Sequence, residues 1–343
     1  MSEFSHSLAR VKAGRILTRH EMRSAMDALL EGAVAEDDIA EFLLALKTRG
    51  ERVEEIVAAA ESMRARAIHV EAPPGAIDTC GTGGDGANTF NISTAAALIV
   101  AGCGAPVAKH GNRSASSRSG SSDILEALGV NLNASPAVIG RCIRDANIGF
   151  MFAAFHHRAV AHVAAVRKRL GVRTIFNLLG PLANPASARR QLMGVYDRAL
   201  TGALAEALGA LGADHAWVVH GSDGLDELTT TGPSFIAETR DGALRQRIVT
   251  PEEVGLARAR PEDLRGGDAR DNALALQGLL RGESGPYRDI AILNSAAALV
   301  VACLAENLVE GARLAGASID EGRAQKALDR LVAISNEDSR EHS

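Results

Sequence analysis

The sequence predicts an α/β protein, with a small all-helical N-terminal domain and a large α/β domain whose mainly parallel central sheet is covered by helices. Apolar residues recur only at helical spacing up to about residue 68. From residue 76 onwards, short strand-like stretches alternate with helical ones. Aromatic residues make up only 3% of the 343 residues, which favours parallel α/β layers over an aromatic-rich β-sandwich.

The N-terminal segment carries the signals of several short helices. Apolar residues repeat at helical spacing over 22–30 and 39–46. Thr18 and Glu21 have the spacing of a capping box at the start of the first of these helices. Gly50 stands where a later helix should end. Helices this short cannot bury all their apolar faces alone, so we expect them to pack on another surface, such as a second copy of the chain.

A proline-containing linker separates the two domains. It spans 69–75 and holds Pro73 and Pro74. We therefore expect a helical domain at 1–70, joined by helices from about 157–190, and an α/β domain at 76–343.

Strands and helices are expected to alternate after the linker. The expected elements are strand 76–80, helix 93–102, strand 106–109, helices 121–128 and 135–147, strand 149–153, helix 157–170, an apolar turn-rich crossing at 174–185, strand 191–196, helix 200–209, strand 215–219, an antiparallel strand pair at 235–249 and a helical C-terminus from about 294. Asp241-Gly242 is the expected hairpin turn.

The first polar loop, DTCGTGGDGANTFNIST at 78–94, follows a predicted strand and leads into a helix. Its glycines match the dinucleotide fingerprint G-x-G-x-x-G, but the next strand ends in Lys109 where that fingerprint expects an acid. The Walker loop pattern is absent as well. Backbone N–H groups at a helix start favour an anion, so the loop is a candidate phosphate cradle; a capped tight turn is the structural alternative.

The second loop, KHGNRSASSRSGSS at 109–122, follows the next strand. Lys109 offers a charge for a phosphate, and Asn112 and the serine hydroxyls offer hydrogen bonds. A Ser-rich surface loop is the alternative reading. Between 78 and 170 the chain carries nine lysines and arginines against five acids, although its overall formal charge is −5. This distribution suits a small anionic substrate and argues against general nucleic-acid binding.

An acidic pair, Asp226-Glu227, follows a predicted strand in the α/β domain. Ligands of α/β proteins bind at the carboxyl ends of strands, and adjacent carboxylates can share Mg²⁺ with substrate phosphates. A solvated turn is the alternative. His156, His157 and His162 lack the spacing of a zinc site. Arg167 belongs to a basic run that is either a solvated helix face or a carboxylate-binding site.

Compartment signals point to the cytoplasm. The four cysteines form no CxxC pair, as expected of free thiols in a reducing compartment. The N-terminus has no apolar signal segment, and no apolar run approaches the ~20 residues that span a bilayer. We therefore expect no membrane association.

Four long motifs occur together in one known family. They are GTGGDGANTFNIST, KHGNRSASSRSGSSDILEALG, VRKRLGVRTIFNLLGPLANP and DGLDEL. On these motifs nearly the whole chain resembles the anthranilate phosphoribosyltransferases, the type-III phosphoribosyltransferases of tryptophan biosynthesis. The resemblance implies that anthranilate attacks 5-phosphoribosyl-1-pyrophosphate (PRPP), giving N-(5-phosphoribosyl)anthranilate and pyrophosphate, with two Mg²⁺ ions per monomer. It also implies a homodimer formed through the helical domain.

The same resemblance implies residue roles. PRPP would be bound by Gly81, Gly84, Asp85, Thr89, Asn91, Ile92, Ser93, Thr94, Lys109, His110, Gly111, Asn112, Arg113, Ser114, Ala115, Ser116, Ser117 and Ser121. Anthranilate would be bound by Gly81, Asn112 and Arg167, and Mg²⁺ by Ser93, Asp226 and Glu227. Arg158 and Val160 stand where the family usually has Pro and Met, beside the expected anthranilate channel. Two other readings are a pyrimidine nucleoside phosphorylase of the same fold and a non-catalytic, nucleic-acid-binding relative.

Overall fold

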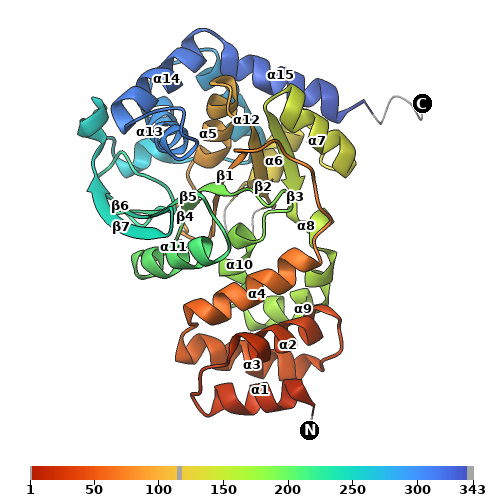
Figure 1. The fold of residues 1–343 in the computed structure, drawn as a ribbon. Helices are drawn as coiled ribbons and strands as arrows, with labels where there is room; N and C mark the ends of the chain where they lie inside the picture. The colour runs from red at the N-terminus through yellow and green to blue at the C-terminus, as the bar shows by residue number, and fades with distance from the viewer. Residues whose placement is uncertain (1, 114–117, 338–343) are drawn as a thin grey trace.

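An all-helical N-terminal region stands below a larger α/β domain (Figure 1). The computed structural model describes residues 2–113 and 118–337. The predicted fold class is confirmed, with helices on both faces of a mainly parallel sheet. Of the predicted site residues, Ser114, Ala115, Ser116 and Ser117 lie outside the described residues.

The N-terminal helices are α1 (Glu3–Lys12), α2 (Arg19–Leu30), α3 (Glu36–Arg49) and α4 (Val53–Ala65). The predicted capping box is present at α2, where the Thr18 N–H donates to Glu21 at 2.8 Å and the Glu21 N–H donates to Thr18 Oγ1 at 3.2 Å. Helix α3 ends at Gly50, whose φ of 85° suits glycine. The local signals therefore placed these helix boundaries correctly.

The sheet of the described chain has the strand order β3-β2-β1-β4-β5-β6-β7. The strands are β1 (Ile77–Gly81), β2 (Val107–Gly111), β3 (Ile148–Phe152), β4 (Arg190–Gly194), β5 (His215–Gly221), β6 (Ser234–Arg240) and β7 (Ala243–Val249). The neighbouring strands β3, β2, β1, β4 and β5 pair in parallel. Strand β6 is antiparallel to both of its neighbours, β5 and β7. Asp241 and Gly242 form the predicted hairpin turn, both at positive φ.

The remaining helices cover the sheet or extend the helical region. They are α5 (Ile92–Gly102), α6 (Ser121–Ala127), α7 (Pro136–Asp145), α8 (Ala153–His156), α9 (Ala161–Leu170), α10 (Phe176–Leu182), α11 (Thr201–Ala210), α12 (Ala269–Leu280), α13 (Pro286–Val301), α14 (Leu308–Asp320) and α15 (Arg323–Ser335). Helices α9 and α10 pack against α2, α3 and α4 (Figure 1).

Three sequence-based expectations differ from the structure. The stretch 174–185, expected to be an apolar turn-rich crossing, contains α10, which includes Pro181 and ends one residue after it. A 3₁₀ turn at Arg158–Val160 precedes α9, so the helix expected from 157 begins at Ala161. The C-terminal helices begin with α12, which was not expected, and α13 begins at Pro286 rather than near 294.

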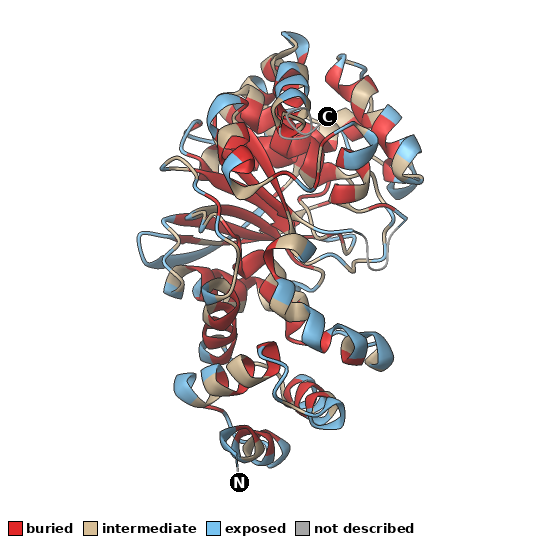
Figure 2. Ribbon diagram, turned by 90° about the vertical axis from the view of Figure 1, so that its right-hand side faces the viewer, coloured by how far each residue is buried: buried red, intermediate tan, exposed pale blue. Residues whose placement is uncertain are grey.

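Two hydrophobic clusters lie on opposite faces of the sheet. Along β4 and β5, Leu192 and Trp217 belong to one cluster and Met193 and Val218 to the other, as strand alternation requires. The second cluster runs without interruption from the N-terminal helices through α9, α10 and α11 to the sheet. Buried residues fill the sheet and the helices packed on it, whereas the N-terminal helices are exposed on their outer faces (Figure 2). The helical region therefore shares a core with the α/β domain.

Candidate active site

Most of the predicted site residues gather where the parallel strands end, whereas Arg167 lies on α9. The first loop follows β1, the second follows β2, and the acidic pair follows β5. Because β1 pairs with both β2 and β4, and β4 pairs with β5, these strand ends are neighbours on one edge of the sheet. This edge is where ligands bind in open α/β sheets.

The acidic turn packs directly against the first glycine loop. The Gly83 N–H donates to Asp226 Oδ2 at 2.7 Å. A Cβ atom on Gly194 would lie 1.5 Å from the Asp226 carbonyl oxygen, and one on Gly81 would lie 2.3 Å from Asp226 Oδ2. Only glycine permits this approach at the paired ends of β1 and β4. Sequence analysis singled out Gly81 but missed Gly194.

The first loop also presents unused hydrogen-bond donors. Among the described residues, no acceptor is recorded for the backbone N–H groups of Gly84, Asp85 and Gly86. Three of the loop glycines, Gly83, Gly84 and Gly86, have positive φ. Successive amides in such a loop form a concavity that binds anions. This arrangement fits the phosphate cradle expected from the sequence.

Three carboxyl groups meet at the acidic turn. Burial, followed by the nearby Asp85 carboxylate, raises the pKa of Asp226. Burial and then Asp226 raise the pKa of Glu227, which the Lys109 ammonium partly offsets. Clustered, partly buried carboxylates suit a divalent cation. Within the described residues, no group of three or more His, Cys, Asp or Glu side chains is arranged to hold a metal by itself. An ion bound beside these carboxylates could share its coordination with a substrate phosphate.

Lys109 and Ser93 lie together beneath this cluster. The Lys109 side chain is buried, and its Nζ donates to the Thr79 carbonyl at 2.5 Å and to Ser93 Oγ at 3.3 Å. Burial lowers the pKa of Lys109, whereas the Asp78 carboxylate opposes that shift. The ammonium therefore stands at the start of α5, beside a predicted Mg²⁺ ligand, rather than in open solvent.

Distant residues hold the start of α5 in place. Asn91, the residue before this helix, accepts a hydrogen bond from Asn272 Nδ2 at 2.9 Å and donates to the Ser119 carbonyl at 3.2 Å. The Tyr287 hydroxyl donates to the Asn91 carbonyl at 3.4 Å. Sequence analysis missed Asn272 and Tyr287, because they belong to α12 and α13 and carry no motif of their own. Ile92 and Thr94 occupy the first turn of α5 and are buried. Thr89, earlier in the loop, forms an isolated bridge with Arg265.

Beyond β2, the described part of the second loop (residues 112–113 and 118–122) is held mainly by contacts within the loop and to the following helix, α6. Arg113 forms ion pairs with Asp123 at 2.8 Å and Glu126 at 2.9 Å. The Gly120 N–H donates to Asp123 at 2.8 Å, and Ser121 Oγ donates to the Asn112 carbonyl at 3.4 Å. Gly111 admits a close approach, since a Cβ there would lie 2.2 Å from Ser121 Oγ. His110 is buried, and its backbone N–H donates to Asp78 Oδ1 at 3.1 Å.

Arg167 is a cation without an acidic partner among the described residues. It lies on α9 with its guanidinium carbon 5.2 Å from the centre of the Phe176 ring. Burial lowers the pKa of Arg167. A partly desolvated guanidinium of this kind suits a carboxylate ligand. Arg158, the departure from the family pattern, is exposed and lies over Phe155 at 5.0 Å.

Arg173 connects the helical region to the first loop and was also missed. It lies between α9 and α10, and its Nη2 donates to the Gly84 carbonyl. Its guanidinium carbon lies 3.7 Å from the centre of the Tyr196 ring. The Tyr196 N–H in turn donates to Thr82 Oγ1 at 3.2 Å.

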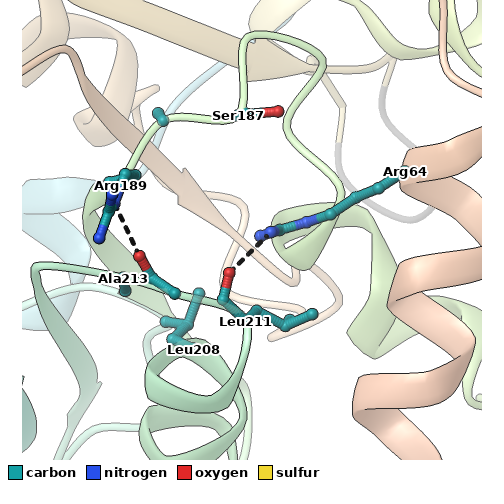
Figure 3. A pocket seen from close by; sticks show the side chains of 8 residues that line it. Arg64, Ser187, Arg189, Leu208, Leu211 and Ala213 are labelled. Atoms are coloured by element: carbon teal, nitrogen blue, oxygen red, sulfur yellow. Dashed lines mark hydrogen bonds between the residues drawn. The ribbon is translucent and has the colours of Figure 1, made fainter. Parts of the chain in front are cut away.

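A separate cavity of about 300 Å³ lies between α4, α11 and the segment 187–189 (Figure 3). It is lined by none of the predicted site residues. Arg64 reaches it and donates to the carbonyls of Leu182 at 2.7 Å and Leu211 at 3.1 Å. These carbonyls close the C-terminal ends of α10 and α11, where a cation is favoured. The burial of Arg64 is therefore explained without a ligand.

Comparison with known proteins decides the family. The model of the glycosyl transferase family, a/b domain, matches residues 73–325, and that of the helical bundle domain matches residues 5–67. An anthranilate phosphoribosyltransferase of Beijerinckia indica is 54% identical over 340 residues, which are 99% of each chain. The chain belongs to the anthranilate phosphoribosyltransferase family. The predicted family and enzyme class are confirmed.

Solved structures of family members share the fold. The enzyme from Thermus thermophilus superposes with a TM-score of 0.92 at 44% identity, over 96% of this chain and 99% of that one. The Saccharomyces cerevisiae enzyme in complex with PRPP and Mg has a TM-score of 0.88 at 26% identity, over 97% and 98% of the two chains. Another structure of the yeast enzyme is a complex with 4-fluoroanthranilate.

Proposed function

We propose that this protein transfers the 5-phosphoribosyl group of PRPP to the amine of anthranilate, giving N-(5-phosphoribosyl)anthranilate and pyrophosphate in tryptophan biosynthesis. The observation that carries the proposal is the meeting of the acidic turn with the glycine loop, seen in the hydrogen bond from Gly83 to Asp226. Identity of 54% to a relative of this activity over nearly the full chain supports the same reaction.

PRPP would lie across the ends of β1 and β2. The unused amides at 84–86 and the start of α5 would hold its pyrophosphate, because both present N–H groups to an anion. Lys109 would add positive charge from below the site. The remaining donors would come from Asn112, Ser121 and the rest of the second loop.

Mg²⁺ would be held by Ser93, Asp226 and Glu227, with two ions per monomer. Asp226 and Glu227 suit this role, because desolvation and a neighbouring carboxylate (Asp85 for Asp226, and Asp226 for Glu227) raise the pKa of each. When bound, the metal neutralises charge on the pyrophosphate leaving group. The loop amides and Lys109 would strengthen that electrostatic stabilisation, with each donor contributing on the order of 3 kcal/mol in the transition state.

Anthranilate would be oriented by Arg167, through its carboxylate, together with Asn112 and Gly81. An aromatic amine is neutral at pH 7, so its lone pair is available and the site needs no strong general base. Breaking the bond to pyrophosphate is then the difficult step, and orientation of the amine supplies part of the acceleration.

A homodimer formed through the helical region, in the cytoplasm, completes the proposal. Two large apolar side chains of the helical region are exposed, Ile16 between α1 and α2 at 49% and Leu44 on α3 at 39%, which supports a contact there. Within residues 2–113 and 118–337, no helix combines the length and apolar character needed to cross a bilayer.

The test is loss of anthranilate fluorescence on mixing the protein with PRPP and Mg²⁺. We expect turnover that requires all three components and releases one pyrophosphate for each anthranilate consumed. Phosphorolysis of thymidine or uridine without anthranilate turnover would favour the nucleoside phosphorylase reading instead. Binding of RNA or DNA with no turnover would favour the non-catalytic reading.

A further inference from the structure

We infer that Arg173 is a positioning residue that holds the first glycine loop in its anion-binding conformation and links that loop to the helical region. The inference rests on the proposed function, because it assigns the loop to PRPP. Arg173 would act through the loop backbone and would not touch the reacting atoms.

A closed ring of contacts surrounds the loop. Arg173 binds the Gly84 carbonyl and stacks on Tyr196, and the Tyr196 N–H binds Thr82, two residues before Gly84. Between these points, the Gly83 N–H binds Asp226. Three consecutive loop residues are therefore held by partners from three different parts of the chain.

The Gly84 carbonyl sets the direction of a neighbouring amide. In a trans peptide the C=O of one residue and the N–H of the next point in opposite directions, and the described chain contains no cis peptide bond. By holding the Gly84 oxygen, Arg173 therefore turns the Asp85 N–H away from itself. That N–H has no acceptor among the described residues and belongs to the proposed phosphate cradle.

Arg173 is suited to a positioning role because its charge is not neutralised by an ion pair with a described acidic residue. Among the described residues no carboxylate lies within ion-pair distance of its guanidinium. A Cβ on Gly84 would lie 3.6 Å from Arg173 Nε, so the guanidinium lies against the loop backbone itself. The face of the guanidinium is occupied by the Tyr196 ring, an arrangement that a planar cation makes better than an ammonium.

The contact between Arg173 and Gly84 also joins the helical region to the sheet. The residue follows α9, which packs on α2 and α3, whereas the loop follows β1 of the sheet. Arg167, the proposed anthranilate ligand, lies six positions earlier in the same segment. One short segment of the helical region would thus bind the acceptor at one end and hold the donor-binding loop at the other.

The test compares Arg173→Met and Arg173→Lys with the matched control Arg198→Met. Arg198 also stacks on an aromatic ring, with its guanidinium carbon 3.6 Å from the centre of Phe235, but within the described part of the chain it forms no hydrogen bond with the first loop. We expect Arg173→Met to raise the KM for PRPP about tenfold, as for loss of one charge-assisted hydrogen bond. The KM for anthranilate at saturating PRPP should change less than twofold. Arg173→Lys should restore part of the loss, and Arg198→Met should match the wild type.

A second readout, independent of turnover, is a calorimetric titration of the protein with PRPP in the presence of Mg²⁺ and the absence of anthranilate. Weakened PRPP binding in Arg173→Met, at an unchanged melting temperature, supports the inference. Equal increases in both KM values, or an Arg173→Met protein that behaves like Arg198→Met, overturns it. Wild-type protein that binds PRPP but transfers nothing to anthranilate contradicts the proposed function alone, whereas an active wild type with a neutral Arg173→Met contradicts only the inference.

Discussion

The two loops of the candidate site are held in different ways. The first loop depends on residues far away in the sequence, since Arg173, Asp226 and Asn272 reach it from three other parts of the chain. The described part of the second loop beyond β2 (residues 112–113 and 118–122) depends mainly on neighbours, with Arg113 paired to Asp123 and Glu126 in the following helix. The first loop therefore needs the whole fold to take its shape, whereas the second carries much of its own support.

The largest effect should come from the acid pair that meets the first loop. Asp226→Asn combined with Glu227→Gln keeps the size of both side chains but removes the charge proposed to hold Mg²⁺. We expect kcat to fall at least about 10²- to 10³-fold, the loss typical of removing transition-state electrostatics, and the Mg²⁺ optimum to shift. Steady-state kinetics over a range of Mg²⁺ concentrations measure both. Asp214→Asn, at an exposed acid paired with Arg189, is the control; wild-type kinetics in the double variant would remove the metal role.

Arg167 belongs to neither loop, and its loss should affect the KM for anthranilate much more than the KM for PRPP. Arg167→Ala removes a proposed charge-assisted contact to the anthranilate carboxylate, so the KM for anthranilate should rise about 10- to 100-fold. The KM for PRPP should change far less. Arg169→Ala is the matched control on the same helix, because Arg169 is already paired with Glu36 and Asp37. Equal increases in both KM values would count against the assignment.

The second loop should be less sensitive to the loss of a single contact. Asp123→Asn weakens the ion pair to Arg113, an exposed interaction of the kind that contributes at most about 1 kcal/mol. We expect the KM for PRPP to rise about two- to fivefold, with no change in the KM for anthranilate. Glu126→Gln, the other partner of Arg113, should have a still smaller effect. A loss as large as that expected for Arg173→Met would show that the second loop is not supported locally.

Acid should weaken the fold through the histidines at the base of the second loop. Burial, and then His156, lower the pKa of His157 to about 4, and its ring lies 5.1 Å from that of His110. Above pH 6.5 His157 is neutral in both states. Between about pH 6.5 and pH 4 the unfolded chain binds a proton that the folded chain does not, so stability falls as the pH falls.

The expected loss from this one group is about 1–2 kcal/mol between pH 7 and pH 5. Urea unfolding at the two pH values measures it. His157→Gln should lose less stability on acidification than the wild type, whatever its stability at pH 7. An identical pH dependence in the two proteins would exclude His157 as a source.

Features encoded locally could be predicted from the sequence, and features created by tertiary contacts could not. The capping box at Thr18, the turn at Asp241-Gly242 and the strand-loop-helix order around the first loop all rest on neighbouring residues. Helix α10 lies in the stretch expected to be a turn-rich crossing, and it packs against α4, a contact that the local sequence does not indicate.

The missed site residues follow the same rule. Gly194 matters because Asp226, thirty-two positions later, packs against it. Asn272 and Arg173 matter because they meet Asn91 and Gly84 across the fold. Gly194 and Asn272 lie outside the four motifs quoted above, and although Arg173 lies inside one of them, nothing in its spacing indicates the contact with Gly84.

The continuous core beneath the sheet limits how this protein can be divided. Side chains of α2 and α4 pack in the same hydrophobic cluster as Met193 of β4 and Val218 of β5. Cutting the chain in the linker would therefore expose apolar surface on both fragments, and neither should be a well-behaved product when expressed alone. Exchanging the first four helices for those of a distant homologue would succeed only if the contacting residues of the sheet and α11 were exchanged with them.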